Sequence, residues 1–142
     1  MNSTLFQYGR RCVIASLLGV ALIGLNSCGA PGPVNTIVKD YAIEMNQTTA
    51  KSGKVSFKIT NSGSVVHEFV VVKTDLPIDK LPTAADGDID EDKLEIPGEQ
   101  GDLEVGKSAD LTLDLTAGRY LMICNLPNHY KLGMHTEFMV TP

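Results

Sequence analysis

Basic residues are scarce in this chain of 142 residues: 12 lysines and arginines face 17 aspartates and glutamates, for a formal net charge of −5. Affinity for nucleic acid comes mainly from lysine and arginine contacts to phosphates, so this balance disfavours a nucleic-acid partner. The chain also lacks a glycine-rich phosphate-binding loop and any internal repeat. Composition therefore gives no indication of nucleotide chemistry.

A long apolar run is missing as well. The apolar segment Cys12–Leu25 is shorter than the roughly 20 residues that a membrane-spanning helix needs. Arg10 and Arg11 precede it and small residues follow it, which is the order of a secretory signal with its basic flank, apolar segment and cleavage region. We therefore expect residues 1–27 to be a signal peptide for export.

The end of this signal carries a further motif. Leu25-Asn-Ser-Cys28 resembles the lipobox of bacterial lipoproteins, in which cleavage leaves the cysteine as the new N-terminus with lipid on its sulfur. The resemblance implies that Cys28 is a lipid anchor and that the protein lies on the periplasmic or extracellular face of a membrane. Glycine and proline without an apolar pattern make residues 28–33 a flexible tether. The alternative is an ordinary signal with Cys28 near the cut.

Cysteine is also rare, and its three positions have different expected fates. Cys12 leaves with the signal and Cys28 carries the lipid, so Cys124 remains unpaired in an oxidising compartment. An unpaired thiol there is either a hazard or in use. A disulfide between Cys28 and Cys124 is the alternative, and it requires the lipobox interpretation to be wrong.

The chain left after export has 115 residues and a net charge of −7, which is enough for one domain with one core. Alternation of apolar and polar residues dominates it and predicts strands. The predicted strands are Ile37–Met45, Val55–Thr60, Val65–Lys73, Ala109–Leu115, Arg119–Cys124 and Glu137–Thr141. Short strands separated by glycine and asparagine turns favour an all-β sandwich, a single domain over residues 34–142.

Residues 75–102 form the longest stretch without a strand pattern, and many of them are acidic. The run Asp86–Asp92 resembles a calcium loop, but an EF-hand needs glycine at its sixth position and glutamate at its twelfth. Those positions hold Glu91 and Pro97. We therefore interpret the acidic residues of 86–104 as a solvated surface, with docking of a basic partner as its functional alternative.

Three soft ligands follow one another near the end of the chain: Cys124, His129 and Met134 are five residues apart. A weak axial methionine is the usual fourth partner of a copper site with two histidines and one cysteine. His135 adjoins Met134, which makes joint ligation awkward. His67 lies in an apolar stretch that is typical of a core strand, so His67 is the candidate for the second histidine.

Each of these residues has an ordinary structural interpretation. His67 alone is compatible with a core histidine, Met134 with a core-filling side chain and Cys124 with an inert thiol. A hydrolase with Cys124 as nucleophile and His129 as base is a further hypothesis. No orienting acid or oxyanion group is evident nearby, so we do not expect an enzyme.

The end of the chain also resembles a known family. Gly118-Arg-Tyr120 leading into Cys124, the run of Cys124, His129 and Met134, and the final strand Glu137–Val140 are similar to the C-terminal signature of cupredoxins, the blue copper proteins. The ligand spacing is closer to that of auracyanin and rusticyanin than to that of plastocyanin or azurin.

The resemblance implies a Greek-key sandwich over residues 34–142. It implies one type 1 copper held by His67, Cys124 and His129 in a plane, with Met134 axial, in a monomer that carries single electrons. The partners are then a redox donor and acceptor, which the acidic surface suggests have a basic docking face. Glu68 departs from the asparagine that plastocyanin-like and azurin-like members place after the first histidine, which leaves the reduction potential open.

A second function shares the same soft ligands. An extracytoplasmic copper chaperone or copper buffer also uses cysteine, histidine and methionine, and the departure at Glu68 is compatible with it. Such a protein should bind Cu(I) far better than Cu(II) and hand it on by ligand exchange. An electron carrier instead cycles without losing the metal.

Overall fold

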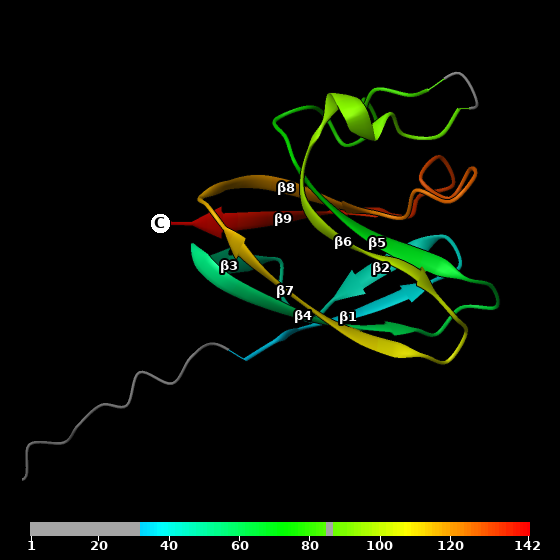
Figure 1. The fold of residues 1–142 in the computed structure, drawn as a ribbon, viewed down its shortest axis with the longest axis horizontal. Coiled ribbons are helices and arrows are strands. Elements are labelled where there is room, and N and C mark those ends of the chain that lie inside the picture. Colours follow the sequence, from blue (N-terminus) through cyan, green and yellow to red (C-terminus); the bar gives the residue numbers. More distant parts are fainter. Residues whose placement is uncertain (1–31, 85–86) are drawn as a thin grey trace, which may run out of the picture. The chain divides into compact units, whose positions relative to one another are not determined.

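The computed structural model describes residues 32–84 and 87–142, which form two β-sheets packed face to face (Figure 1). The first sheet has the strand order β2-β1-β4-β7, with bounds β1 Val34–Lys39, β2 Ala42–Met45, β4 Gly53–Asn61 and β7 Ser108–Leu115. The second has the order β3-β9-β8-β5-β6, with bounds β3 Thr49–Lys51, β5 His67–Lys73, β6 Glu95–Leu103, β8 Gly118–Ile123 and β9 His135–Thr141. The predicted all-β sandwich is confirmed.

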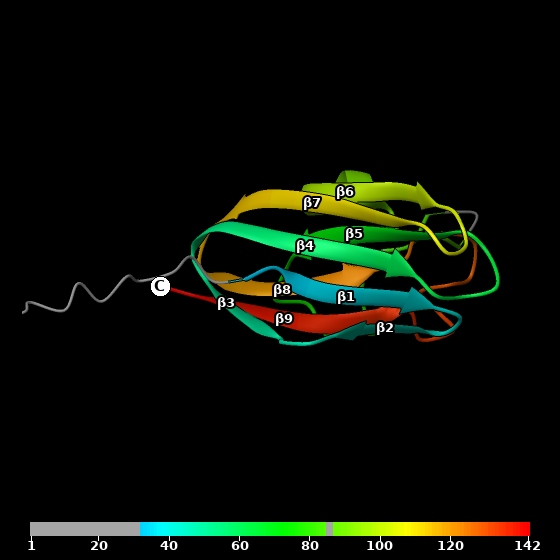
Figure 2. The ribbon, with the colours of Figure 1, turned by 90° about the horizontal axis from the view of Figure 1, so that it is seen from below.

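The chain passes between the two sheets several times, as in a Greek-key sandwich. The chain crosses from β4 to β5, returns from β6 to β7 and crosses again to β8. Pairing is antiparallel except between β1 and β4 and between β3 and β9. Three connections meet at one end of the sandwich in both views: β1 to β2, β4 to β5 and β8 to β9 (Figures 1 and 2).

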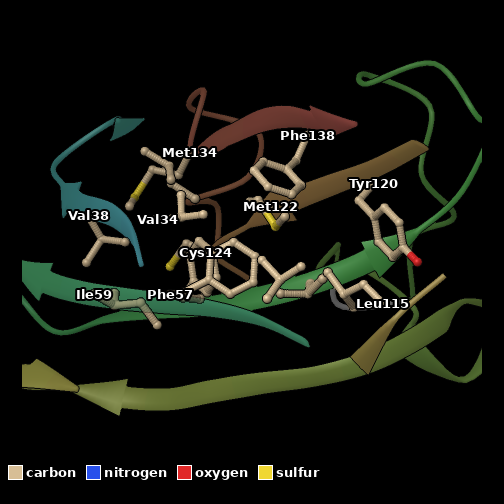
Figure 3. Close-up of a cluster of buried hydrophobic side chains, with 14 of the residues drawn as sticks. Val34, Val38, Phe57, Ile59, Leu115, Tyr120, Met122, Cys124, Met134 and Phe138 are labelled. Atoms are coloured by element: carbon tan, nitrogen blue, oxygen red, sulfur yellow. The ribbon is translucent and has the colours of Figure 1, made fainter. Parts of the chain in front are cut away.

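A core of apolar side chains fills the space between the sheets (Figure 3). Phe57 of β4 contacts Phe69 of β5 and Phe138 of β9, with ring centroids 5.4 and 5.6 Å apart, so one aromatic side chain joins the two sheets. Full burial of such a side chain is worth about 1.5–3 kcal/mol. Cys124 and Met134 lie in the same cluster, which places the predicted ligands against the core.

A second apolar cluster lies on the other face of the five-stranded sheet. Val70 and Val72 of β5 pack there with Leu81 and Ile89 of the segment that connects β5 to β6. This explains why β5 is buried on both faces. The connecting segment includes a short 3-10 helix, Glu91–Lys93, and runs along this face of the sheet (Figure 1).

The predicted strand Ile37–Met45 is wrong as a single element. It is a hairpin, because Asp40 and Tyr41 form a turn in which Lys39 pairs with Ala42 and Tyr41 has φ 69°. Apolar residues stand on both sides of the turn, and no glycine or proline marks it. The sequence pattern therefore gave no sign of the interruption.

The prediction that residues 75–102 lack a strand is wrong in its last part. Residues Glu95–Leu103 form β6, which pairs with β5 through the backbone. Its side chains do not alternate between buried and exposed, and the pairing shifts register twice. An edge strand held by main-chain hydrogen bonds has little sequence signal.

Within the described residues, no helix is long and apolar enough to cross a membrane. The predicted signal peptide 1–27 and the predicted anchor Cys28 lie outside the described residues.

Candidate metal centre

The loop between β8 and β9 holds three of the four predicted ligands. It closes on itself at its base, where the backbone N–H of Cys124 donates to the carbonyl of Met134 at 3.0 Å. Inside the loop, the N–H of His129 donates to Leu126 O at 2.9 Å and that of Met134 donates to His129 O at 3.1 Å. The five-residue intervals of the sequence thus correspond to the turns of one compact loop.

His67 reaches the same place from β5. His67 Nδ1 lies 3.3 Å from His129 Nδ1, and Cys124 Sγ also lies 3.3 Å from His129 Nδ1. Within the described residues, these three side chains form a group that could hold a metal ion, with their donor atoms within 4.8 Å of one another. The structure therefore brings together a histidine and a loop that are 57 residues or more apart in the sequence.

Met134 belongs to the same site. It is buried, and with His67 and His129 it lines a cavity of about 330 Å³ at the end of the sandwich where the three connections meet. Its sulfur and that of Cys124 lie toward the same end of the core (Figure 3). His135 does not join the group, because its ring packs on Tyr130 with centroids 5.1 Å apart.

Burial shifts the pKa of two of the donors, Cys124 and His129. It raises the pKa of the Cys124 thiol, while the backbone N–H groups of Glu68 and Leu126 act in the opposite direction. Burial, and then the neighbouring His67, lower the pKa of His129. The site thus favours a neutral thiol and a neutral imidazole, and a coordinating metal would deprotonate the thiol.

The donor set fits copper. A thiol, two imidazoles and a thioether are soft or borderline donors, whereas calcium and magnesium require oxygen. The two imidazole Nδ1 atoms and the thiol have each other as neighbours, so their donor atoms face a common point. The side chains present are those expected of a blue copper site.

The residue after the first histidine is Glu68, whose carboxylate cannot donate hydrogen bonds as an asparagine amide does. The backbone N–H of Glu68 donates to Cys124 Sγ at 3.3 Å, and its side chain is half-buried near other carboxylates. The buried amide of Asn61 ties the β4 to β5 connection instead, since its Nδ2 donates to Val65 O at 2.8 Å and Leu103 O at 2.7 Å.

Sequence reasoning missed the contacts that surround the ligands. His67 Nε2 lies 3.2 Å from Asp40 Oδ1, although Asp40 falls inside the segment predicted as an unbroken strand. Asn125 exchanges hydrogen bonds with Ile89, and Tyr130 donates to Ile78 O. These links attach the acidic connecting segment to the ligand loop. No local pattern in the sequence marks either contact.

Residues 44–142 match a family model described as the sulfocyanin (SoxE) domain. No curated protein matches the chain.

Solved structures with the same fold include two auracyanins and a rusticyanin. Reduced auracyanin from the photosynthetic bacterium Roseiflexus castenholzii is 22% identical, with a TM-score of 0.63 over 80% of this chain and 100% of that one. Rusticyanin from Thiobacillus ferrooxidans is 22% identical, with a TM-score of 0.58 over 79% of each chain. Auracyanin B is 23% identical, with a TM-score of 0.55 over 80% of this chain and 93% of that one.

Proposed function

Because the chain belongs to the sulfocyanin (SoxE) family of cupredoxins, whose cofactor is one type 1 copper, we propose that it carries single electrons between redox partners outside the cytoplasm. His67, Cys124 and His129 would hold the copper, and the Met134 thioether would be a further, weaker donor. The observation that carries the proposal is the approach of Cys124 Sγ and His67 Nδ1 to within 3.3 Å of His129 Nδ1.

Copper bound here supplies a centre that gains or loses one electron. The chain's own contribution is to keep the ligands from moving. His67 begins β5 and Cys124 directly follows β8, and these two strands are hydrogen-bonded neighbours. His67 and Cys124 are 1% and 0% exposed, so both are shielded from bulk solvent. A rigid, buried site changes little in geometry when its charge changes, which favours fast electron transfer.

His129 is only half-buried, so part of its side chain reaches the protein surface beside the site. Exposed apolar side chains lie around the same cavity: Val65 is 47% and Leu132 55% exposed. This face suits the close approach of a redox partner, and apolar side chains there cost little to desolvate. The net charge of the exported chain favours donors and acceptors with a basic docking face.

Copper titration of the purified full-length protein tests the ligand set. The oxidised protein should show intense visible absorption from thiolate-to-copper charge transfer, together with the paramagnetic-resonance spectrum of a type 1 site. Cys124→Ser should abolish the colour, while Cys28→Ser, the matched control, should leave it unchanged. A colourless, redox-silent wild-type protein after Cu(II) loading would rule the proposal out.

The same Cys28→Ser variant tests the membrane location. Export followed by lipidation predicts that the wild-type protein fractionates with membranes and that Cys28→Ser is found in the soluble exported fraction. The basis of this proposal is the signal-like segment 1–27 with its Leu25-Asn-Ser-Cys28 ending. If the wild-type and Cys28→Ser proteins distributed equally between the membrane and soluble fractions, lipid anchoring would be contradicted. The proposal for the copper site would not be affected.

A copper chaperone or buffer is the second candidate. The cavity beside His67, His129 and Met134 favours it, because it gives an incoming ligand a route to the donors. Affinities for Cu(I) and Cu(II) separate the two functions. Reversible one-electron cycling without metal loss supports the electron carrier, whereas strong preference for Cu(I) with rapid transfer to a chelator supports the chaperone.

A further inference from the structure

The two ring nitrogens of His67 face different partners. Nδ1 faces His129 Nδ1 at 3.3 Å, and Nε2 faces Asp40 Oδ1 at 3.2 Å. His67 is 1% exposed, so its ring is confined by the core. A carboxylate oxygen only accepts hydrogen bonds, so this contact requires the proton of His67 on Nε2. Nδ1 is then free to act as a ligand.

Asp40 is itself held in place by Ser64. The backbone N–H of Ser64 donates to Asp40 Oδ1 at 3.0 Å and to Oδ2 at 3.2 Å, and its hydroxyl donates to Oδ2 at 2.7 Å. The Ser64 hydroxyl and N–H also hold the pKa of Asp40 below its usual value. The carboxylate therefore has a defined orientation before any metal binds.

The backbone leaves room for this contact at Gly63. A Cβ atom at Gly63 would lie 2.5 Å from His67 Nε2 and 2.7 Å from Asp40 Oδ1, which is closer than real contacts allow. Asn61 Oδ1 accepts the N–H of Gly63 at 2.8 Å and keeps the connection in this position. Two loops that are distant in sequence thus converge on one hydrogen bond.

We propose that Asp40 is a positioning residue for the metal centre: it sets the Nε2–H tautomer of His67 and places a negative charge beside that ligand. The inference rests on the proposed function, in that His67 is a copper ligand. A carboxylate that accepts from a ligating histidine orients the ring and raises its basicity. The charge of Asp40 also stabilises the more positive, oxidised state of the centre and so lowers its reduction potential.

Two substitutions separate orientation from charge. Asp40→Asn keeps an oxygen that can accept from Nε2 but removes the charge, whereas Asp40→Ala removes both. Asp40 is half-buried in the turn between β1 and β2 and does not belong to the apolar core, so neither change removes a core side chain. The matched control is Asp114→Asn, which removes the same charge from an exposed position on β7. Asp114 pairs with Lys54, near the start of β4.

The tautomer is measured without metal, by nitrogen NMR of the His67 ring in the purified full-length protein near pH 8. The wild-type protein and Asp40→Asn should show the Nε2–H form, and Asp40→Ala should lose this preference. An Nδ1–H form in the wild-type protein, or an unchanged preference in Asp40→Ala, would overturn the assignment.

The copper-loaded proteins give the second measurement. Asp40→Asn should raise the reduction potential. This rise should become smaller as salt is added, because the Asp40 side chain is 36% exposed and its charge is screened. Asp114→Asn should change the reduction potential less than Asp40→Asn does. Asp40→Ala should weaken copper binding about 10- to 100-fold, as loss of an outer-shell partner typically does. Equal potentials in Asp40→Asn and Asp114→Asn would overturn the role of the charge.

The two proposals fail in different ways. A protein that is blue and redox-active but indifferent to Asp40 contradicts only the positioning role. A colourless, redox-silent protein contradicts the electron carrier, while the tautomer of His67 in the metal-free protein still reports on Asp40.

Discussion

The backbone N–H of Glu68 donates a hydrogen bond to Cys124 Sγ at 3.3 Å. Glu68 directly follows His67 on β5, so one strand presents a ring nitrogen and an N–H to the same site. Hydrogen bonds to the cysteine sulfur tune the potential of a blue copper centre. The residue at position 68 therefore acts on the sulfur through its backbone, whatever its side chain is.

The side chain of Glu68 predicts a pH effect on the stability of the metal-free protein. Burial, and then the charges of Asp102, Glu91 and Glu99, raise its pKa above the usual value of 4.5. The folded protein thus binds this proton more tightly than the unfolded chain does. The resulting stability is fully present below about pH 4.5 and is lost as the pH rises through the raised pKa.

Glu68→Gln should therefore unfold at higher urea concentration than the wild-type protein at pH 7, and the difference should vanish below pH 4.5. Glu104→Gln, an exposed glutamate after β6, serves as the control. Urea denaturation at a series of pH values measures both. A difference that is constant with pH would contradict the assignment to the Glu68 carboxylate.

Met134→Leu tests the axial position. Leucine has nearly the same volume, so unfolding free energy should change by less than about 1.5 kcal/mol although Met134 is 1% exposed. Loss of the thioether donor disfavours the oxidised state, so voltammetry should show a higher potential with the blue colour retained. Met139→Leu, on an exposed methionine of β9, should leave the potential unchanged, and an equal shift in both variants would exclude an axial role for Met134.

Asn125→Ala should release the connecting segment from the ligand loop. Asn125 Oδ1 accepts the N–H of Ile89 at 2.8 Å, and its Nδ2 donates to Glu91 Oε1 at 2.7 Å. Leaving these groups unpaired should cost about 1–3 kcal/mol, and hydrogen exchange at the Ile89 amide should accelerate. Lys93→Gln breaks only the ion pair of Lys93, whose side chain is 64% exposed, with Asp90, and it should change neither the stability nor the exchange at Ile89. Unaltered exchange at Ile89 in Asn125→Ala would show that the amide does not hold this segment.

Phe57→Ala should lower the unfolding free energy by about 3–5 kcal/mol, because it leaves a cavity between the two sheets where Phe57 contacts Phe69 and Phe138. Ile37→Ala, on a side chain that is 40% exposed in β1, should cost less than about 1 kcal/mol. Chemical denaturation compares the two. If the two variants lost similar amounts of unfolding free energy, the contacts of Phe57 between the two sheets would not be a major source of stability.

Local pattern predicted much of the sandwich. Strands β4, β7 and β9 have one face in the core and one in solvent, so their apolar residues alternate and the sequence identified them. The run of Cys124, His129 and Met134 was recognisable because all three belong to one loop. Their roles as copper ligands, and the lipid on Cys28, stay predictions that the experiments above test.

The sequence by itself determined which segments can be strands and which side chains can bind a soft metal, because periodicity and donor chemistry are properties of neighbouring residues. Only the tertiary structure decided that Asp40 meets His67, that β6 pairs with β5 and that Asn125 holds Ile89. Each of these contacts joins residues more than 20 positions apart, and each depends on strand pairing and sheet packing. Such pairing depends on how the whole core packs, so the sequence of a single segment does not identify its distant partner.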